Sequence, residues 1–530
     1  AHLERLAPLV EKSLIYVDPR VFTIRMELFS AIIGVFTFII LSLFLSPIYA
    51  LLFLAISYVT FKGVVTAYLA FRVKRRVKRV EEELPLMAMY MSTIGSLGIN
   101  IHDMLEGLLN AEDMPSISLE VKKIFRDAKL FFGDVLSSLD WNARSHPSKV
   151  WSRYFMGLIS IIHSGGNITR YFEEKTRELL ASLKSRWSIY SERASDWGEM
   201  IIGIFLLAVA LVLISAFIVP TDAYSVLVII AVPVIPLLAL TMIIVMEMLS
   251  PPNRDRIEFR PLLPTLSSLA AALLLAYLEL EFWAILAISS IVFSLYNGYI
   301  VWRQLKEVEE EERWLPHLLR SLIDARKVGM PLDHAIAKIR GFGTRIDNIL
   351  DEVTAQLKMG IPLNRARTHF RSWLAKMTFF VISNLAVYGG GTSEVLEKVY
   401  TFITDVQDAK SVAKSKMRLY AFLAAIAPII VSAMLSITLG LASLYMNTLT
   451  GQMEVVGIGF STLEFDYAGL ISLSRLIVVE SGIAMGLAVA KARSLTVKDT
   501  RLVALIVLIS IASFMAFNYI RPEAILGIIP

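Results

Sequence analysis

The stretches ELPLMAMYMSTIGSLGINIHDML (residues 83–105) and WLPHLLRSLIDARKVGMPLDHAI (residues 314–336) decide the fold, because they are two versions of one pattern. Each begins near a Leu-Pro pair. Gly98 follows Pro85 by 13 positions, and Gly329 follows Pro316 by the same number. Each then continues with an Asp and a His side by side. The chain is therefore expected to contain one structural unit twice.

Later matches extend the repeat. LFFGDVL around Gly133 corresponds to LKMGIPL around Gly360. FMGLISIIHSGGNITRYFEE, from Phe155, corresponds to FFVISNLAVYGGGTSEVLEK, from Phe379, with the same spacing to the glycines. We call the unit around residues 72–197 the first repeat and the unit around residues 303–418 the second repeat.

Both repeats read as α-helical. Apolar residues recur at three- and four-residue spacing after Pro85, and no alternating strand pattern appears. The acidic residues 81–83 before Pro85 favour the first turn of a helix, where proline and negative charge are both accepted. Each repeat is expected to be a compact bundle of about six helices.

Glycines mark the ends of the expected helices. A glycine at the end of a helix adopts the left-handed conformation readily, and polar residues after it accept the first amides of the next helix. A phosphate loop is the alternative for HSGGNITRYFEE, but it follows a helix rather than a strand and no Lys follows its glycines. The expected turn or hinge glycines are Gly98, Gly165, Gly166, Gly329, Gly389 and Gly390.

The composition predicts an all-α polytopic membrane protein. Of 530 residues, 56% are hydrophobic, which exceeds ordinary soluble proteins. Stretches near the roughly 20 residues that cross a bilayer as a helix occur about nine times. They fall at 27–45, 47–71, 198–219, 224–249, 262–279, 282–302, 419–446, 471–490 and 500–520.

Basic residues predict the orientation. The links near 72–79, 250–261, 410–418 and 491–501 are rich in Lys or Arg, whereas the 447–470 loop has neither. Since positive charge collects on cytoplasmic loops, the N-terminal segment 1–26 and the domains 72–197 and 303–418 are expected in the cytoplasm. The hairpins 27–71, 198–249 and 262–302, the helix 419–446 and the two helices in 471–520 would cross the membrane. The 447–470 loop and the C-terminus would be extracellular.

Composition and motifs argue against several classes of function. The chain has no cysteine and a net charge of only +5, so thiolate sites and nucleic-acid binding are not expected. It lacks the G-x-x-x-x-G-K-[ST] loop and the H-E-x-x-H pair. No catalytic residue, cofactor site or metal site is therefore predicted.

The duplicated Leu-Pro…Gly and Gly-Gly…Glu segments, each bracketed by membrane helices, resemble the F-domain family of type II secretion and type IV pilus machines. Two such domains with about nine spans are most similar to the archaeal branch, which includes archaellum and adhesion-pilus platforms, and to Tad pilus platforms. The resemblance implies a non-enzymatic platform beneath which a hexameric secretion ATPase docks. It also implies contacts with pilin subunits and membrane lipid, and a homodimer.

Two groups of basic residues are candidate ATPase contacts under this resemblance. The alternative is that they fix topology and contact lipid headgroups. They are Arg72, Lys74, Arg75, Arg76, Lys78 and Arg79 in the first repeat and Lys410, Lys414, Lys416 and Arg418 in the second.

Glu480 lies in the middle of an expected span, where an ionisable group costs several kcal/mol unless it has a partner or a cavity. Arg475 is expected within its reach. The pair would either meet pilin helices or an oligomer partner, or simply fix helix packing.

The predicted function is a cell-membrane platform that couples the ATPase to pilin extraction and filament assembly. A polytopic transporter with parallel repeats is the alternative, although few intramembrane charges are available to bind a solute. A membrane enzyme is a weaker alternative, because no catalytic grouping stands out.

Overall fold

The computed structural model describes residues 10, 12–13, 19–42, 47–218, 225, 227–251, 254–389, 391–456 and 467–519. All regular structure in these residues is helical, as the sequence predicts. The chain forms two compact units. Unit 1 comprises residues 1–181, 362–364 and 379–399, and unit 2 comprises residues 182–361, 365–378 and 400–530.

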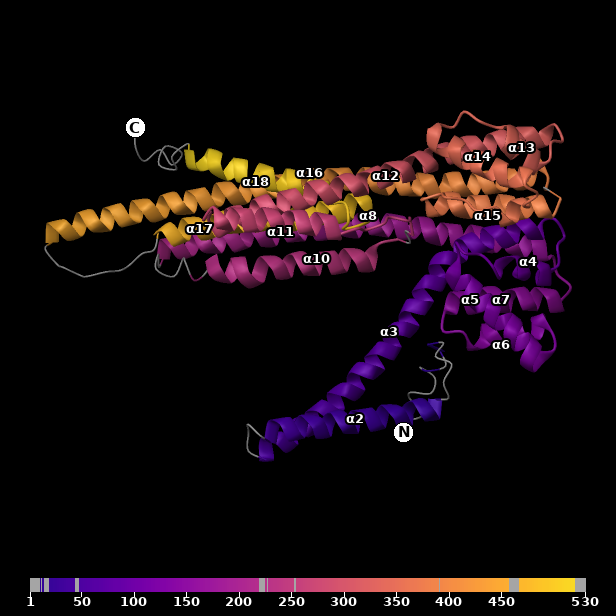
Figure 1. The fold of residues 1–530 in the computed structure, drawn as a ribbon, viewed down its shortest axis with the longest axis horizontal. Helices are drawn as coiled ribbons and strands as arrows, with labels where there is room; N and C mark the ends of the chain where they lie inside the picture. Colours follow the sequence, from indigo (N-terminus) through magenta and orange to yellow (C-terminus); the bar gives the residue numbers. More distant parts are fainter. Residues whose placement is uncertain are drawn as a thin grey trace. The chain divides into compact units, whose positions relative to one another are not determined.

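Unit 1 joins a helical hairpin to a bundle (Figure 1). The hairpin consists of α2 (Pro19–Ser42) and α3 (Pro47–Gly95), which share a core around Met26 and Leu69. The bundle contains the end of α3 and the beginning of α8 (Ile168–Ile218). Between them lie α4 (Ile101–Leu108), α5 (Pro115–Asp127), the π-helical η1 (Ala128–Phe132), α6 (Val135–Ser145) and α7 (Lys149–His163).

Part of the second repeat also belongs to unit 1. The end of α15 (Trp373–Val387) and the first turns of α16 (Ser393–Val456) pack on the first repeat. The rings of Tyr90 and Phe380 lie 5.3 Å apart. The hydroxyl of Tyr388 donates to the carbonyl oxygen of Asp103 at 3.2 Å. Residues 379–399 of the second repeat therefore share a core with the first repeat.

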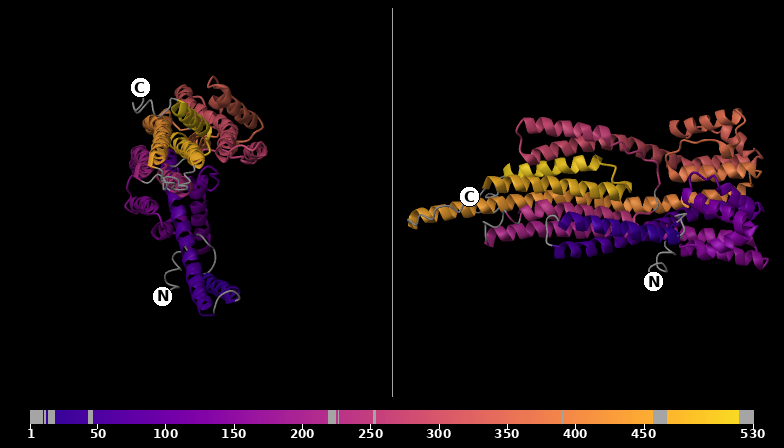
Figure 2. Two further views of the ribbon diagram at one scale, coloured as in Figure 1. Left: turned by 90° about the vertical axis from the view of Figure 1, so that its left-hand side faces the viewer. Right: turned by 60° about the horizontal axis from the view of Figure 1, so that its bottom comes forward.

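Unit 2 contains a group of apolar helices, shown from a second direction in Figure 2. These are α10 (Ile235–Leu249), α11 (Leu262–Tyr277), α12 (Phe282–Lys327), α17 (Tyr467–Ser494) and α18 (Arg501–Tyr519), preceded by the π-helical η2 (Ile230–Val234). Helices α17 and α18 lie close together at Gly486, where an added Cβ would lie 2.5 Å from the Cα of Val503. Ala287, Val479, Val503 and Val507 form the buried core of this group.

Four described helices are long and apolar enough to cross a membrane: Leu227–Leu249, Phe282–Lys327, Ala468–Ser494 and Arg501–Tyr519. Leu262–Tyr277 and Ala425–Gly440 are shorter apolar helices. Several other expected spans include residues outside the described part of the chain, so nine spans stay a prediction. Helix α16 continues to Val456, into the expected 447–470 loop, and residues 457–466 are not described.

Pro85 does not begin a helix. It lies inside α3, and Pro316 lies at the matching position inside α12. The buried face continues across Pro85, because Val80, Leu84 and Met87 are all fully buried. Continuous packing on both sides therefore outweighs the lost amide hydrogen bond, a cost of about 3 kcal/mol for a proline inside a helix.

The two repeats differ in one helix. The second repeat contains the end of α12, α13 (Leu332–Lys338), α14 (Thr344–Lys358), the 3-10 turn η3 (Leu363–Arg365), α15 and the start of α16. The described residues thus form six α-helices in the first repeat but five in the second, where η3 stands in place of α6. The segment from Gly360 to Ser372 is shorter than its counterpart from Gly133 to Ser148, and Pro362 interrupts it.

Candidate functional site

The basic run on α3 divides into two faces. Arg72, Arg75, Arg76 and Arg79 recur at three- and four-residue spacing and line a groove of about 510 Å³ in unit 1. Tyr68, Phe71, Leu119 and Glu120 complete much of its wall. Lys74 and Lys78 are exposed and do not line this groove.

Arg76 is a structural residue within this groove. Its Nε and Nη2 donate to the two carboxylate oxygens of Glu120, each at 2.6 Å. Both side chains are nearly buried, at 9% and 1% exposure. This bidentate ion pair ties α3 to α5.

His146 completes a buried cluster with this pair. Its Nδ1 accepts from the amide of Ser148 at 3.0 Å, so the ring proton is on Nε2, which lies 3.5 Å from Glu120. Burial alone would raise the pKa of Glu120, but His146 and Arg76 outweigh it and lower the pKa to about 2. Burial lowers the pKa of His146, although Glu120 opposes this shift.

Three of the four candidate basic residues in the second group form ion pairs with carboxylates inside unit 2. Lys410 donates to both oxygens of Glu312, at 2.6 and 2.9 Å, and its side chain is only 13% exposed. Burial would lower the pKa of Lys410, but Glu312 and Asp255 outweigh it and raise the pKa. Lys410 therefore holds α16 against α12.

The neighbouring lysines are paired more weakly. Lys414 lies 3.2 Å from Glu309, and Lys416 lies 3.9 Å from Glu192. Both pairs are partly exposed, so solvent screens them. The side chain of Arg418 lies outside the described residues.

Each repeat contains one serine helix cap at the same position, which the sequence motifs did not indicate. The hydroxyl of Ser148 caps α7 by accepting the amide of Trp151, and donates to Glu81 on α3 at 2.7 Å. The hydroxyl of Ser372 accepts the amide of Ala375 and donates to Glu312 on α12 at 3.2 Å. Aligning the repeats through Pro85 and Phe155 matches Glu81 with Glu312 and Ser148 with Ser372, so this signal was present in the sequence.

The glycine turns have the geometry of helix ends. Gly98, Gly165, Gly329 and Gly389 all have positive φ, between +67° and +90°. The amide of Gly166 donates to the carbonyl of Ile161 at 2.9 Å, which closes α7. Asn167 then accepts the amide of Arg170 at 3.0 Å and starts α8. Gly390 lies outside the described residues.

The expected pair of Arg475 and Glu480 is not formed. Arg475 instead lies 3.1 Å from Glu281 and 5.3 Å from the ring centroid of Trp283. Glu281 is exposed at the end of the neighbouring helix, whereas one carboxylate oxygen of Glu480 is buried without a hydrogen-bond partner. The partly exposed Glu281 and Trp283 hold Arg475 at the helix end, so it does not turn inward to Glu480.

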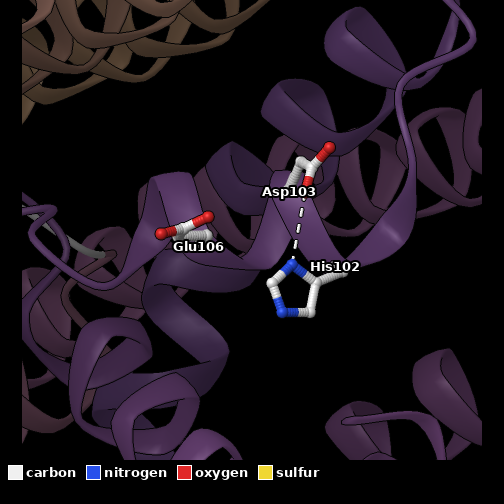
Figure 3. A group of neighbouring side chains, drawn as sticks. All are labelled: His102, Asp103 and Glu106. Atoms are coloured by element: carbon white, nitrogen blue, oxygen red, sulfur yellow. Dashed lines mark hydrogen bonds and ion pairs between the residues drawn. The ribbon is translucent and has the colours of Figure 1, made fainter.

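His102, Asp103 and Glu106 form an exposed cluster on α4 (Figure 3). The Nδ1 of His102 lies 3.2 Å from Asp103, and Asp103 sits in the first turn, where the helix dipole favours a carboxylate. Solvent exposure and the position of Asp103 in the first turn explain why these side chains lie together. Among the described residues, no other potential metal ligand belongs to this cluster.

The fold therefore defines a duplicated, all-α membrane protein whose long helices continue into helical bundles. Comparison with protein families identifies the repeated unit. Residues 87–216 and 318–440 both match the family described as "Type II secretion system (T2SS), protein F". The chain belongs to this family and carries two copies of its domain.

An uncharacterized protein of Methanocaldococcus jannaschii is 24% identical over 111 residues, which is 21% of this chain and 19% of that protein. The chain thus aligns with about a fifth of this relative's length. No solved structure matches the chain.

The proteins of this family are membrane platforms of secretion and pilus-assembly machinery. Platform proteins of this family are non-enzymatic membrane components and generally associate with a secretion ATPase.

Proposed function

We propose that this platform couples a cytoplasmic hexameric secretion ATPase to the extraction of pilins from the membrane and their assembly into an archaeal pilus or archaellum-like filament. Four helices that continue without a break from expected membrane spans into the repeats carry the proposal. They are α3 (49 residues), α8 (51 residues), α12 (46 residues) and α16 (64 residues). A continuous helix transmits displacement along its axis better than a loop does.

The proposed arrangement places domains 72–197 and 303–418 in the cytoplasm, with about nine spans and an extracellular C-terminus. The positive residues at the start of each repeat support this orientation. In this arrangement, the glycine turn at 165–166 lies where a short helix meets α8, and Gly389 lies at the end of the short helix that precedes α16. They are proposed hinges at which movement of a repeat reaches a membrane helix.

The ATPase contact is proposed to use exposed charge rather than the buried pairs. Lys74 and Lys78 remain candidates from the first repeat, because both are exposed and lie away from the arginine groove. Lys414 and Lys416 remain candidates from the second repeat. Each lysine could leave its weak surface ion pair and bind an ATPase carboxylate at little cost in free energy. A homodimer of the platform is part of the proposal.

Co-purification tests the proposal. The full chain, extracted from membranes in mild detergent, is expected to retain the secretion ATPase encoded beside it. Lys74→Glu/Lys78→Glu should weaken this retention, whereas Lys358→Glu, an exposed change in α14, should not. Deletion of the gene should abolish the filament. Undiminished filaments in the deletion strain, or no ATPase retained by the wild-type chain, would overturn the proposal.

A further inference from the structure

One short pattern occurs at the start of both repeats and is not explained by the platform function. The first repeat has Tyr68, Phe71, Arg72 and Arg75 in sequence, and the second has Tyr299, Trp302, Arg303 and Lys306 at the same spacing. Aligning Pro85 with Pro316 brings the two sets into register. In both, an aromatic pair is followed within one helical turn by two cations.

The first set lines an open, positively charged groove. Tyr68 and Phe71 are 56% and 61% exposed, and the guanidinium carbon of Arg72 lies 5.9 Å from the ring centroid of Tyr68. Four arginines line this groove beside one carboxylate, Glu120, which Arg76 already binds. Cations therefore outnumber carboxylates among the described residues that line this groove.

Two residues of the second set line a groove in unit 2, of about 230 Å³. Trp302 and Lys306 line it, and the side chains of Lys306 and Arg501 lie 5.9 and 5.5 Å from the Trp302 ring centroid. Exposed Arg493 adds a further cation to the wall. Cations again outnumber carboxylates in the lining.

Position along the helix identifies the occupant. Each set lies where an apolar helical stretch passes into a charged one. The expected membrane spans end there, at residue 71 in α3 and at residue 302 in α12. Exposed Tyr and Trp are typical of the membrane–water interface, and basic pockets there bind phosphate headgroups of lipids. Arginine binds phosphate oxygens in a bidentate manner.

We propose that each repeat binds the headgroup of an anionic phospholipid in its groove, with Arg72 and Arg75 in the first repeat and Lys306 and Arg493 in the second as the phosphate contacts. The apolar wall of Phe71 or Trp302 packs against the glycerol and upper acyl region. The inference rests on the membrane arrangement in the proposed function, but it does not depend on an ATPase or a filament. Two bound lipids would fix the depth of both repeats at one leaflet.

Native mass spectrometry of the detergent-solubilised full chain tests this inference, with phosphatidylglycerol or phosphatidylcholine added as probe. The wild-type chain is expected to retain two molecules of phosphatidylglycerol and to prefer it over phosphatidylcholine. Arg72→Gln/Arg75→Gln should remove one retained molecule, and Lys306→Gln/Arg493→Gln should remove the other.

Lys74→Gln/Lys78→Gln is the matched control, because it removes two charges from the same helix outside the groove. Equal loss of lipid in the control and the groove variant would overturn the inference. So would inorganic phosphate displacing the lipid at equal concentration, since the acyl region would then contribute nothing. If the groove variant loses the ATPase but retains both lipids, the groove is a protein-docking surface and the inference is wrong.

Discussion

Arg76 and Glu120 form two parallel hydrogen bonds of 2.6 Å between α3 and α5, and the pair is almost completely buried. Arg76 lies within a run that the sequence offers as a partner-binding surface, yet its partner is inside the same domain. A buried pair broken on one side leaves an uncompensated charge, which costs much more than loss of an exposed pair.

We therefore expect Arg76→Ala to destabilise the first repeat by about 3 kcal/mol, whereas Lys74→Ala changes its stability by less than about 0.5 kcal/mol. Hydrogen exchange of the amides in α5 (Pro115–Asp127), measured in the full chain, would detect this difference in stability. Equal protection of α5 in the two variants would show that the pair contributes nothing.

Acidification should loosen the same region in two stages. The pKa of His146 is lowered in the folded state, so the unfolded chain binds the proton more readily and stability falls as pH drops below about 6.5. The pKa of Glu120 is also lowered, to about 2, so its contribution is lost as pH falls from about 4.5 towards 2.

His146→Gln should remove the first stage. Exchange in α5 and α6 (Val135–Ser145), corrected for the intrinsic rate at each pH, should then vary less between pH 7 and pH 5 than in the wild-type chain. An unchanged pH dependence in this variant would assign the first stage to another group.

The matched caps should contribute similarly in both repeats. Ser148→Ala and Ser372→Ala each remove a helix cap and a bond to a carboxylate, and we expect a loss of about 1 kcal/mol or more from each. Limited proteolysis of the full chain under increasing urea would measure both. Ser185→Ala, an exposed change in α8, is a suitable control, and a cap variant no more sensitive than this control would contradict the prediction.

The close approach of α17 and α18 predicts intolerance of any side chain at Gly486. An added methyl group meets the Cα of Val503 at 2.5 Å, so Gly486→Ala should cost about 1–3 kcal/mol and lower the thermal stability in detergent. Gly63→Ala on α3 is the control, because nothing lies within 4 Å of its added Cβ. Gly63→Ala should leave the melting temperature unchanged or raise it slightly.

The sequence predicted the helical class, the duplication and most turns, because these depend on local periodicity and on glycine geometry. Gly165 and Gly329 lie in the left-handed region as their positions suggested. It did not predict that α3 runs through Pro85, since tertiary packing of Leu84 and Met87 overrides a local signal. Nor could it show that Lys410 turns inward to Glu312 or that Arg475 pairs with Glu281, because ion-pair partners are set by three-dimensional proximity.

The family match and the repeated glycine turns agree with the resemblance read from the motifs. The basic residues show which part of the candidate site depends on the three-dimensional structure. Composition gives their number, but only the structure separates Arg76, which is buried in an ion pair, from Lys74 and Lys78, which are exposed.

Continuity of the long helices is the central claim, and a flexible insertion tests it most directly. Four glycines inserted after Arg193 interrupt α8 just before its expected membrane portion, and the same insertion after Asn110, in the link between α4 and α5, is the control. In a strain lacking the chromosomal gene, filaments per cell are counted by electron microscopy, with chain abundance and ATPase retention measured in parallel. The account predicts that the insertion in α8 abolishes filaments while abundance and ATPase retention stay normal, and that the control assembles them. Normal filament numbers with α8 interrupted would contradict transmission through this helix.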